Sequence, residues 1–228
     1  MENSIRMLED YRKYLEQPPG LKGNWSNRYI TFRKAFELFK KKKGKVIVEL
    51  GTTRSYVSGH LPGCLSPDDT FWELENPEKW DWGAGSFTVV AANEFHNSGV
   101  DIYTVDISEE HIRRAQVMTK PYKSVMKYVT DSSENFLKNF NDKIDLLYID
   151  TGNLDAYTRA IHLKEAEIII NRDLISHKGT ILIDDVYRPE ELRGMDYVCK
   201  CEYSLPFFLQ NGFEIVLSHY QTLLKKRT

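Results

Sequence analysis

Short apolar runs alternate with stretches of helical periodicity along most of the chain. The runs cover residues 45–50, 101–106, 126–129, 144–150 and 180–185, with the sequences "KVIVEL", "DIYTVD", "MKYV", "IDLLYID" and "TILIDD". Because successive positions in each run are apolar, the pattern predicts strands buried on both faces of one sheet. The helical stretches between the runs predict parallel β-α units that cover the sheet.

Helices are also predicted at the beginning of the chain. Apolar spacing from Ile5 to Leu15 indicates an amphipathic helix that ends before a Pro-Pro-Gly turn, and a second helix is expected from about Asn27 to Lys42. We expect residues 1–44 to form part of the substrate side of the molecule.

The end of the chain predicts a closing hairpin. Residues 204–210 indicate a helix, and "FEIVLSHYQTLLKK" indicates two further strands joined by a tight turn near residues 218–220. The predicted architecture is an α/β fold with a seven-stranded, mostly parallel sheet, helices on both faces and an antiparallel hairpin at the end.

Composition narrows the class of protein. The 228 residues suit one domain, which we place at residues 1–228. The formal net charge of −2 provides no strong field for nucleic acid or an anionic membrane, so neither partner is expected. The amino terminus has no long apolar segment, which predicts a cytoplasmic protein, and three cysteines without paired spacing predict reduced thiols.

The first strand ends at a glycine, but the expected helix does not follow it. The strand ends in "ELG" at Gly51, and a helix signal returns only in "WGAGSFTVVAANEF" at residues 82–95, with Ser86 as the expected N-cap. Residues 52–82 are therefore predicted to form an inserted loop or lid over the carboxyl ends of the strands. The glycines near it line a cofactor pocket or serve only as turns, and their spacing leaves both interpretations open.

An acid at the end of the second strand favours the cofactor interpretation. Asp106 is followed by Ser108, Glu109 and Glu110, which form an N-cap with acids in the first helical turn. A carboxylate at this strand end is placed to accept hydrogen bonds from both ribose hydroxyls of a nucleoside cofactor. A loop acid or a helix cap is the alternative.

Three segments together resemble the class I S-adenosylmethionine-dependent methyltransferases. They are "VELGT" at 48–52, "YTVDIS" at 103–108 and "VTDSSENF" at 129–136, and the resemblance covers residues 45–224. It implies a Rossmann-like fold with S-adenosylmethionine as cofactor. The cofactor residues that it implies are Glu49, Gly51 and Thr52 at the methionine end, Gly85 and Ser86 near the methionine carboxylate, Asp106 and Ile107 at the ribose, Asp131 and Ser132 at the adenine, and Asp150.

Three acids at neighbouring strand ends suggest a metal. The fourth run ends in Asp150 and the fifth in Asp184 and Asp185. Carboxylates this close cannot all stay ionised without compensation, which Mg²⁺, Mn²⁺ or Ca²⁺ supplies in oxygen-rich sites. The pattern resembles the metal-dependent small-molecule O-methyltransferases, which implies these three acids as ligands. Alternatively, Asp184 and Asp185 cap a turn while Asp150 contacts the substrate.

The predicted reaction is methyl transfer to an oxygen of a small molecule or saccharide, with help of a divalent cation. The three acids are candidate catalytic residues, and His60 in the inserted loop is the first candidate base, although an ordinary loop residue is also consistent with its position. Asn153 stands where catechol-type relatives carry a lysine base. The sequence allows an oligomer.

Two other functions compete with this one. A Rossmann-type NAD oxidoreductase has a similar sheet, but no G-x-G-x-x-G follows the first strand. A methyltransferase-like domain that only binds a cofactor or partner is the second, and the presence of three mutually repelling acids argues against it.

The tryptophans at 72, 80 and 82 have two possible roles. They cover a sugar or ring face of the substrate, or else they pack the inserted loop against the body of the protein.

Overall fold

The protein is described here by a computed structural model, which covers residues 6–17, 27–55, 72–73, 76–83, 85–153, 156–186 and 199–227. A seven-stranded sheet forms its centre, with the strand order β3-β2-β1-β4-β5-β7-β6. The strands are β1 (Val46–Leu50), β2 (Asp101–Asp106), β3 (Met126–Thr130), β4 (Ile144–Ile149), β5 (Ile175–Ile183), β6 (Phe213–Ser218) and β7 (Thr222–Lys226).

The pairing of the strands confirms the predicted fold class. The pairs β1–β2, β1–β4, β2–β3 and β4–β5 are parallel, whereas β7 runs antiparallel to both β5 and β6. Strand β5 starts at Ile175, five residues before the predicted run. The pairing with β4 shifts in register between Ile175 and Thr180, so the strand includes the polar residues between them.

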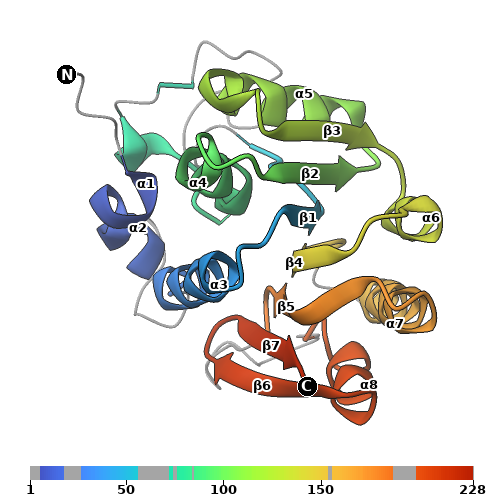
Figure 1. The fold of residues 1–228 in the computed structure, drawn as a ribbon. Coiled ribbons are helices and arrows are strands. Elements are labelled where there is room, and N and C mark those ends of the chain that lie inside the picture. Colours follow the sequence, from blue (N-terminus) through green and yellow to red (C-terminus); the bar gives the residue numbers. More distant parts are fainter. Residues whose placement is uncertain are drawn as a thin grey trace.

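Helices cover both faces of the sheet (Figure 1). One face carries the helices α1 (Met7–Asp10), α2 (Arg12–Glu16), α3 (Tyr29–Lys41), α4 (Ser86–Phe95) and α5 (Glu109–Met118), with the short turns η3 (Pro77–Lys79) and η4 (Lys120–Tyr122). The other face carries α6 (Ser133–Asn139), α7 (Ala156–Asn171) and α8 (Ser204–Gln210). Neighbouring residues of a strand alternate between these two layers, as the pleat requires: Ile47 joins the first and Val48 the second.

Two helix boundaries differ from the sequence expectation. The first predicted helix is divided at Tyr11 into α1 and α2. Ser86 is the first residue of α4 and not its N-cap, which was the predicted role; the cap position belongs to Gly85. Gly85 has a φ of +106°, and a Cβ atom there would lie 2.3 Å from the Cα atom of Thr53. The chain therefore enters α4 through a position where only glycine fits.

Among the described residues, no helix is long and apolar enough to span a membrane.

Glu49 joins three elements from inside the core. Its side chain is fully buried on β1, and its carboxylate accepts hydrogen bonds from Thr88 of α4 at 2.8 Å and from Thr104 of β2 at 2.7 Å. Burial raises the pKa of Glu49 to about 8, although the two hydroxyl donors oppose the shift. The folded protein therefore holds a proton on this acid that the unfolded chain releases.

We predict that Glu49→Gln reduces the loss of stability that accompanies a rise in pH from about 4.5 to 8. The unfolded carboxyl ionises near pH 4.5 and the folded one near 8, so its contribution to stability is present below the lower value and falls as the pH rises through this window. The variant cannot ionise, so the wild-type free energy of unfolding should fall more steeply, by up to about 1.4 kcal/mol per pH unit. Urea unfolding from pH 5 to 9 measures this. Glu37→Gln, an exposed change on α3, is the control, and parallel wild-type and Glu49→Gln curves would contradict the prediction.

We predict that Gly51→Ala destabilises the fold more than Gly212→Ala. Both glycines have positive φ, +84° and +87°, but a Cβ atom on Gly51 would lie 2.7 Å from the backbone oxygen of Asp150, whereas nothing lies within 4 Å at Gly212. Both variants should lose about 1–2 kcal/mol through backbone strain. Gly51→Ala should lose roughly 1–3 kcal/mol more, because β1 and β4 must move apart. Equal urea midpoints would show that the close approach relaxes freely.

Candidate functional site

A cavity of about 440 Å³ lies at the carboxyl ends of the central parallel strands. This edge of an open α/β sheet is where ligands bind. The residues that line it end or follow the strands β1 to β4, lie on α5 or α7, or, like Lys200, precede α8. They include Gly51, Thr52, Arg54, Asp106, Ile107, His111, Asp131, Ser132, Asp150, Thr151, Asn153, Tyr157 and Lys200. The fold therefore brings most of the predicted cofactor residues together around one space.

Asp106 is held rigidly at the end of β2. Its carboxylate accepts hydrogen bonds from the backbone N–H groups of Thr52 at 3.2 Å and Ser108 at 2.8 Å, and lies 3.2 Å from Nδ1 of His111. Burial alone raises the pKa of Asp106, but the hydrogen bonds from His111, Ser108 and Thr52 lower it below its ordinary value. The side chain is thus an ionised acceptor that faces the cavity. Ile107 beside it is 78% exposed and forms an apolar wall.

Asp131 and Ser132 form the next part of the wall, at the start of α6. Asp131 accepts hydrogen bonds from the backbone N–H of Ser132 at 2.8 Å and from the side-chain amide of Asn135 at 2.6 Å. Ser132 is the N-cap of α6, and its hydroxyl accepts from the backbone N–H of Asn135. Both residues line the cavity, so their positions agree with the role that the resemblance implies.

Three predicted cofactor residues lie elsewhere. Glu49, Gly85 and Ser86 are not among the described residues that line the cavity. Glu49 points into the core toward Thr88 and Thr104. Gly85 packs against the backbone of Thr53, and the side chain of Ser86 is buried. Their observed contacts support the fold around the cavity.

The three acids predicted at the ends of β4 and β5 do converge. Asp150, Asp184 and Asp185 each offer one carboxylate oxygen, and these oxygens lie within 4.8 Å of one another. Asp185 has a backbone φ of +54°, in the left-handed region, so the chain changes direction directly after β5. The sequence prediction of an acidic cluster at this point is therefore confirmed.

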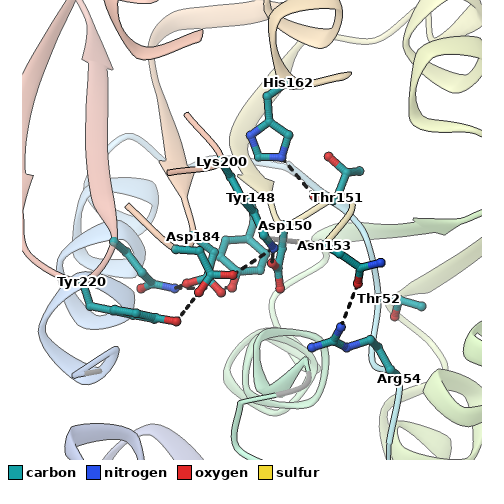
Figure 2. A network of polar contacts seen from close by, with 12 residues as sticks. Thr52, Arg54, Tyr148, Asp150, Thr151, Asn153, His162, Asp184, Lys200 and Tyr220 are labelled. Atoms are coloured by element: carbon teal, nitrogen blue, oxygen red, sulfur yellow. Dashed lines mark hydrogen bonds and ion pairs between the residues drawn. The ribbon is translucent and has the colours of Figure 1, made fainter. Parts of the chain in front are cut away.

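Two cations from distant parts of the chain already pair with this cluster. Figure 2 shows one of them, Lys200, beside Asp150. Nζ of Lys200 lies 2.6 Å from Asp150 and 3.0 Å from Asp185. The guanidinium of Arg28 lies 3.1 Å from Asp184. Lys200 and Arg28 are each only 4% exposed, so both ion pairs are shielded from water.

Residues of the β6–β7 turn complete the cluster. The side-chain amide of Gln221 donates to Asp184 at 2.7 Å, and the hydroxyl of Tyr220 donates to Asp185. Arg28 also stacks over the Tyr220 ring, 4.5 Å from its centroid. The closing hairpin therefore supplies contacts to the acidic site as well as edge strands to the sheet.

The electrostatics of the cluster differ from acid to acid. Burial raises the pKa of Asp150 to about 7, and the negative charges of Asp184 and Asp185 add to the rise, whereas Lys200 opposes it. Burial also acts on Asp185, but Lys200 and Arg28 lower its pKa to about 2. Burial alone lowers the pKa of Lys200, and the three acids raise it above its ordinary value, so the ammonium stays charged at neutral pH.

Residues of α7 hold the loop that follows β4. The hydroxyl of Thr151 donates to buried Glu165 at 2.8 Å, and Nε2 of His162 donates to the Thr151 carbonyl at 3.1 Å (Figure 2). Burial lowers the pKa of His162 to about 4, which keeps the ring neutral. His162 is thus a buried packing residue, and it fixes the loop beside Asp150. On the other side of the cavity, Arg54 donates to Asn153 at 3.4 Å.

Sequence reasoning missed four residues of the site. His111 lies on a helical stretch, where the sequence by itself indicates a surface or packing residue, but its place in the first turn after Ser108 points it back to Asp106. Tyr157 lies in the first turn of α7 and is 74% exposed at the cavity. Lys200 and Arg28 belong to no motif, so their pairing with the acids follows only from the tertiary fold.

The inserted loop is described only in part. His60, the candidate base, and most of the predicted lid lie outside the described residues. Trp80 and Trp82 are buried, and their rings lie 5.4 and 6.0 Å from Tyr11, while Trp72 lies 4.4 Å from Trp80. These tryptophans pack the segment against the amino-terminal helices, which agrees with the packing interpretation.

Part of the chain matches a known protein family. Residues 82–186 match a family described as a methyltransferase domain. No curated protein sequence matches the chain.

Two solved structures illustrate the likeness in fold. A Podospora anserina methyltransferase bound to S-adenosylhomocysteine is similar with a TM-score of 0.57 and 15% identity, over 97% of this chain and 87% of that one. The O-methyltransferase TomG from Streptomyces achromogenes, which is involved in tomaymycin synthesis and was solved with S-adenosylmethionine, has a TM-score of 0.54 and 8% identity, over 100% and 91%. The chain therefore shares its overall fold with these methyltransferases, and residues 82–186 match the methyltransferase-domain family.

Proposed function

We propose that the protein transfers a methyl group from S-adenosylmethionine to an oxygen of a small molecule or saccharide in the cavity at the carboxyl edge of the sheet. The observation that carries the proposal is the arrangement along this cavity. Asp106, Ile107, Asp131 and Ser132 line one part of it, and Asp150 with Lys200 lines another. One part suits a nucleoside and the other suits a reacting polar group.

The adenosine part of the cofactor is assigned to the ends of β2 and β3. Asp106 is ionised and already accepts three hydrogen bonds, which leaves carboxylate lone pairs for ribose hydroxyls. Ile107 provides an exposed apolar surface for a base, and Asp131 and Ser132 offer polar groups to its edge. S-adenosylmethionine supplies the activated methyl group when it is bound.

The methyl acceptor is assigned to the part of the cavity beside Asp150. Methyl transfer needs alignment of the acceptor with the methyl group and an acceptor atom in its nucleophilic form. The ammonium of Lys200 is a hydrogen-bond donor, so it suits an acceptor atom with a free lone pair, such as a hydroxyl or carboxyl oxygen, and not a protonated amine, which has none. This donor supports O-methylation. Arg28, which pairs with Asp184, supports the assignment of the amino-terminal region to the substrate side.

The acidic cluster as arranged does not suit the divalent cation expected from the sequence. The donor set has the right chemistry, three carboxylate oxygens within 4.8 Å. However, the Lys200 ammonium stands between Asp150 and Asp185, at 2.6 and 3.0 Å, where a shared metal ion would have to bind. The residues as arranged therefore do not fit a divalent cation, and no step of the reaction is derived through one.

Calorimetry tests the cofactor, and product detection tests the reaction. We expect saturable binding of S-adenosylmethionine and S-adenosylhomocysteine but not of NAD. A panel of phenols, carboxylic acids, sugars and amines is then assayed for S-adenosylhomocysteine release. Methylation of amines in preference to hydroxyl or carboxyl oxygens would overturn the proposed acceptor class, and tight NAD binding would overturn the cofactor.

We predict that Asp106→Ala weakens binding of S-adenosylmethionine by roughly tenfold or more, because hydrogen bonds to a charged acceptor contribute about 1.5–3 kcal/mol. Isothermal titration calorimetry measures the affinity, and circular dichroism checks the fold. Asp101→Ala is the matched control, since Asp101 lies at the opposite end of β2 and pairs on the surface with Lys127 at 3.5 Å. Unchanged affinity in Asp106→Ala would remove this acid from the cofactor site.

A further inference from the structure

Lys200 lies in an unusual place for a lysine. Its side chain is almost completely buried, it lies between β5 and α8 in the chain, and its ammonium is shared between two carboxylates at the ends of two different strands. Figure 2 shows it directed toward Asp150 beside the cavity. Burying an ammonium costs several kcal/mol unless carboxylates compensate for it, so this position requires the acids around it.

The charges of the cluster are nearly balanced without any ion. Asp150, Asp184 and Asp185 carry three negative charges when ionised, and Arg28 and Lys200 supply two positive ones, which leaves a net charge of −1. A divalent cation in addition would reverse the net charge to +1. The electrostatic reason for a metal at three crowded carboxylates is therefore already met by the chain itself.

The geometry agrees with the charge balance. Lysine has three N–H donors, and the described carboxylates within 3.0 Å of Nζ are those of Asp150 and Asp185. With respect to these described partners, one N–H is left for a group in the cavity. A fixed ammonium can therefore hold the two carboxylates together and still offer one hydrogen bond to a bound ligand.

We propose that Lys200 is the resident cation of this acidic site and occupies the position that a divalent metal would need, so that the site works without a metal ion. Its remaining N–H group donates to the acceptor oxygen; this second part rests on the proposed function. The first part concerns only the binding of cations, and it can be tested with the metal alone.

The test compares Mn²⁺ binding to the wild type and to Lys200→Met, by electron paramagnetic resonance and calorimetry after treatment with EDTA. Methionine has a similar length but no charge, so three carboxylates would then face Arg28 alone. We expect no saturable site in the wild type up to millimolar Mn²⁺ and one new site in Lys200→Met, with affinity increased about tenfold or more. Lys200→Arg, which keeps the charge, should gain no site.

Lys143→Met is the matched control, because Lys143 pairs with Asp173 on the surface at 2.8 Å and its loss uncovers no cluster. If Lys200→Met does not fold alone, folding on addition of Mn²⁺, but not of NaCl at equal ionic strength, supports the proposal. Failure to fold with either salt counts against it.

A saturable Mn²⁺ site in the wild type, as tight as in Lys200→Met, would overturn the proposal. A folded Lys200→Met without a new Mn²⁺ site would do the same. Titration of both proteins with S-adenosylhomocysteine in EDTA separates this question from the proposed function. If the wild type does not bind S-adenosylhomocysteine, the proposed function is contradicted, but the Mn²⁺ comparison between the two proteins is still valid.

Discussion

Three carboxylates meet where β4 and β5 end, and the rest of the site is arranged to compensate for their charge. Their partners come from both ends of the chain: Arg28 precedes α3, Lys200 precedes α8, and Tyr220 and Gln221 lie in the turn between β6 and β7. Removing one partner of a buried ion pair leaves an uncompensated charge and costs about 3–5 kcal/mol. The acidic cluster therefore ties both ends of the chain to the central strands.

The cavity beside this cluster is a consequence of the strand order. Strands β1 and β4 are neighbours, and the next α-helices described after them in the chain, α4 and α7, cover opposite faces of the sheet. Gly51 allows the two strand ends to approach closely, since a side chain there would meet the backbone of Asp150. The chain beyond β1 can then contribute Thr52 to the Asp106 side of the cavity.

Two acids on adjacent strands show how local packing decides a role. Glu49 and Asp106 lie on β1 and β2, but Glu49 faces the helix layer and is enclosed by threonines, whereas Asp106 is the last residue of its strand and reaches the cavity. Burial without a cation raises the pKa of Glu49, and the donors around Asp106 lower its pKa. The first acid joins elements of the core, and the second is an ionised acceptor for a ligand.

The sequence alone determined the order of elements, the parallel sheet with its closing hairpin, and the convergence of Asp150, Asp184 and Asp185. Apolar runs fix which residues are strands, and parallel strands bring the residues after them to one edge. The tertiary structure decided the direction of Glu49, the contact of His111 with Asp106, and the identity of the cations at the acids. Arg28 is 156 residues away from Asp184 in the sequence, and Lys200 is 50 residues away from Asp150. Such pairs have no local pattern, because their energy depends on burial and distance after folding and not on neighbours in the chain.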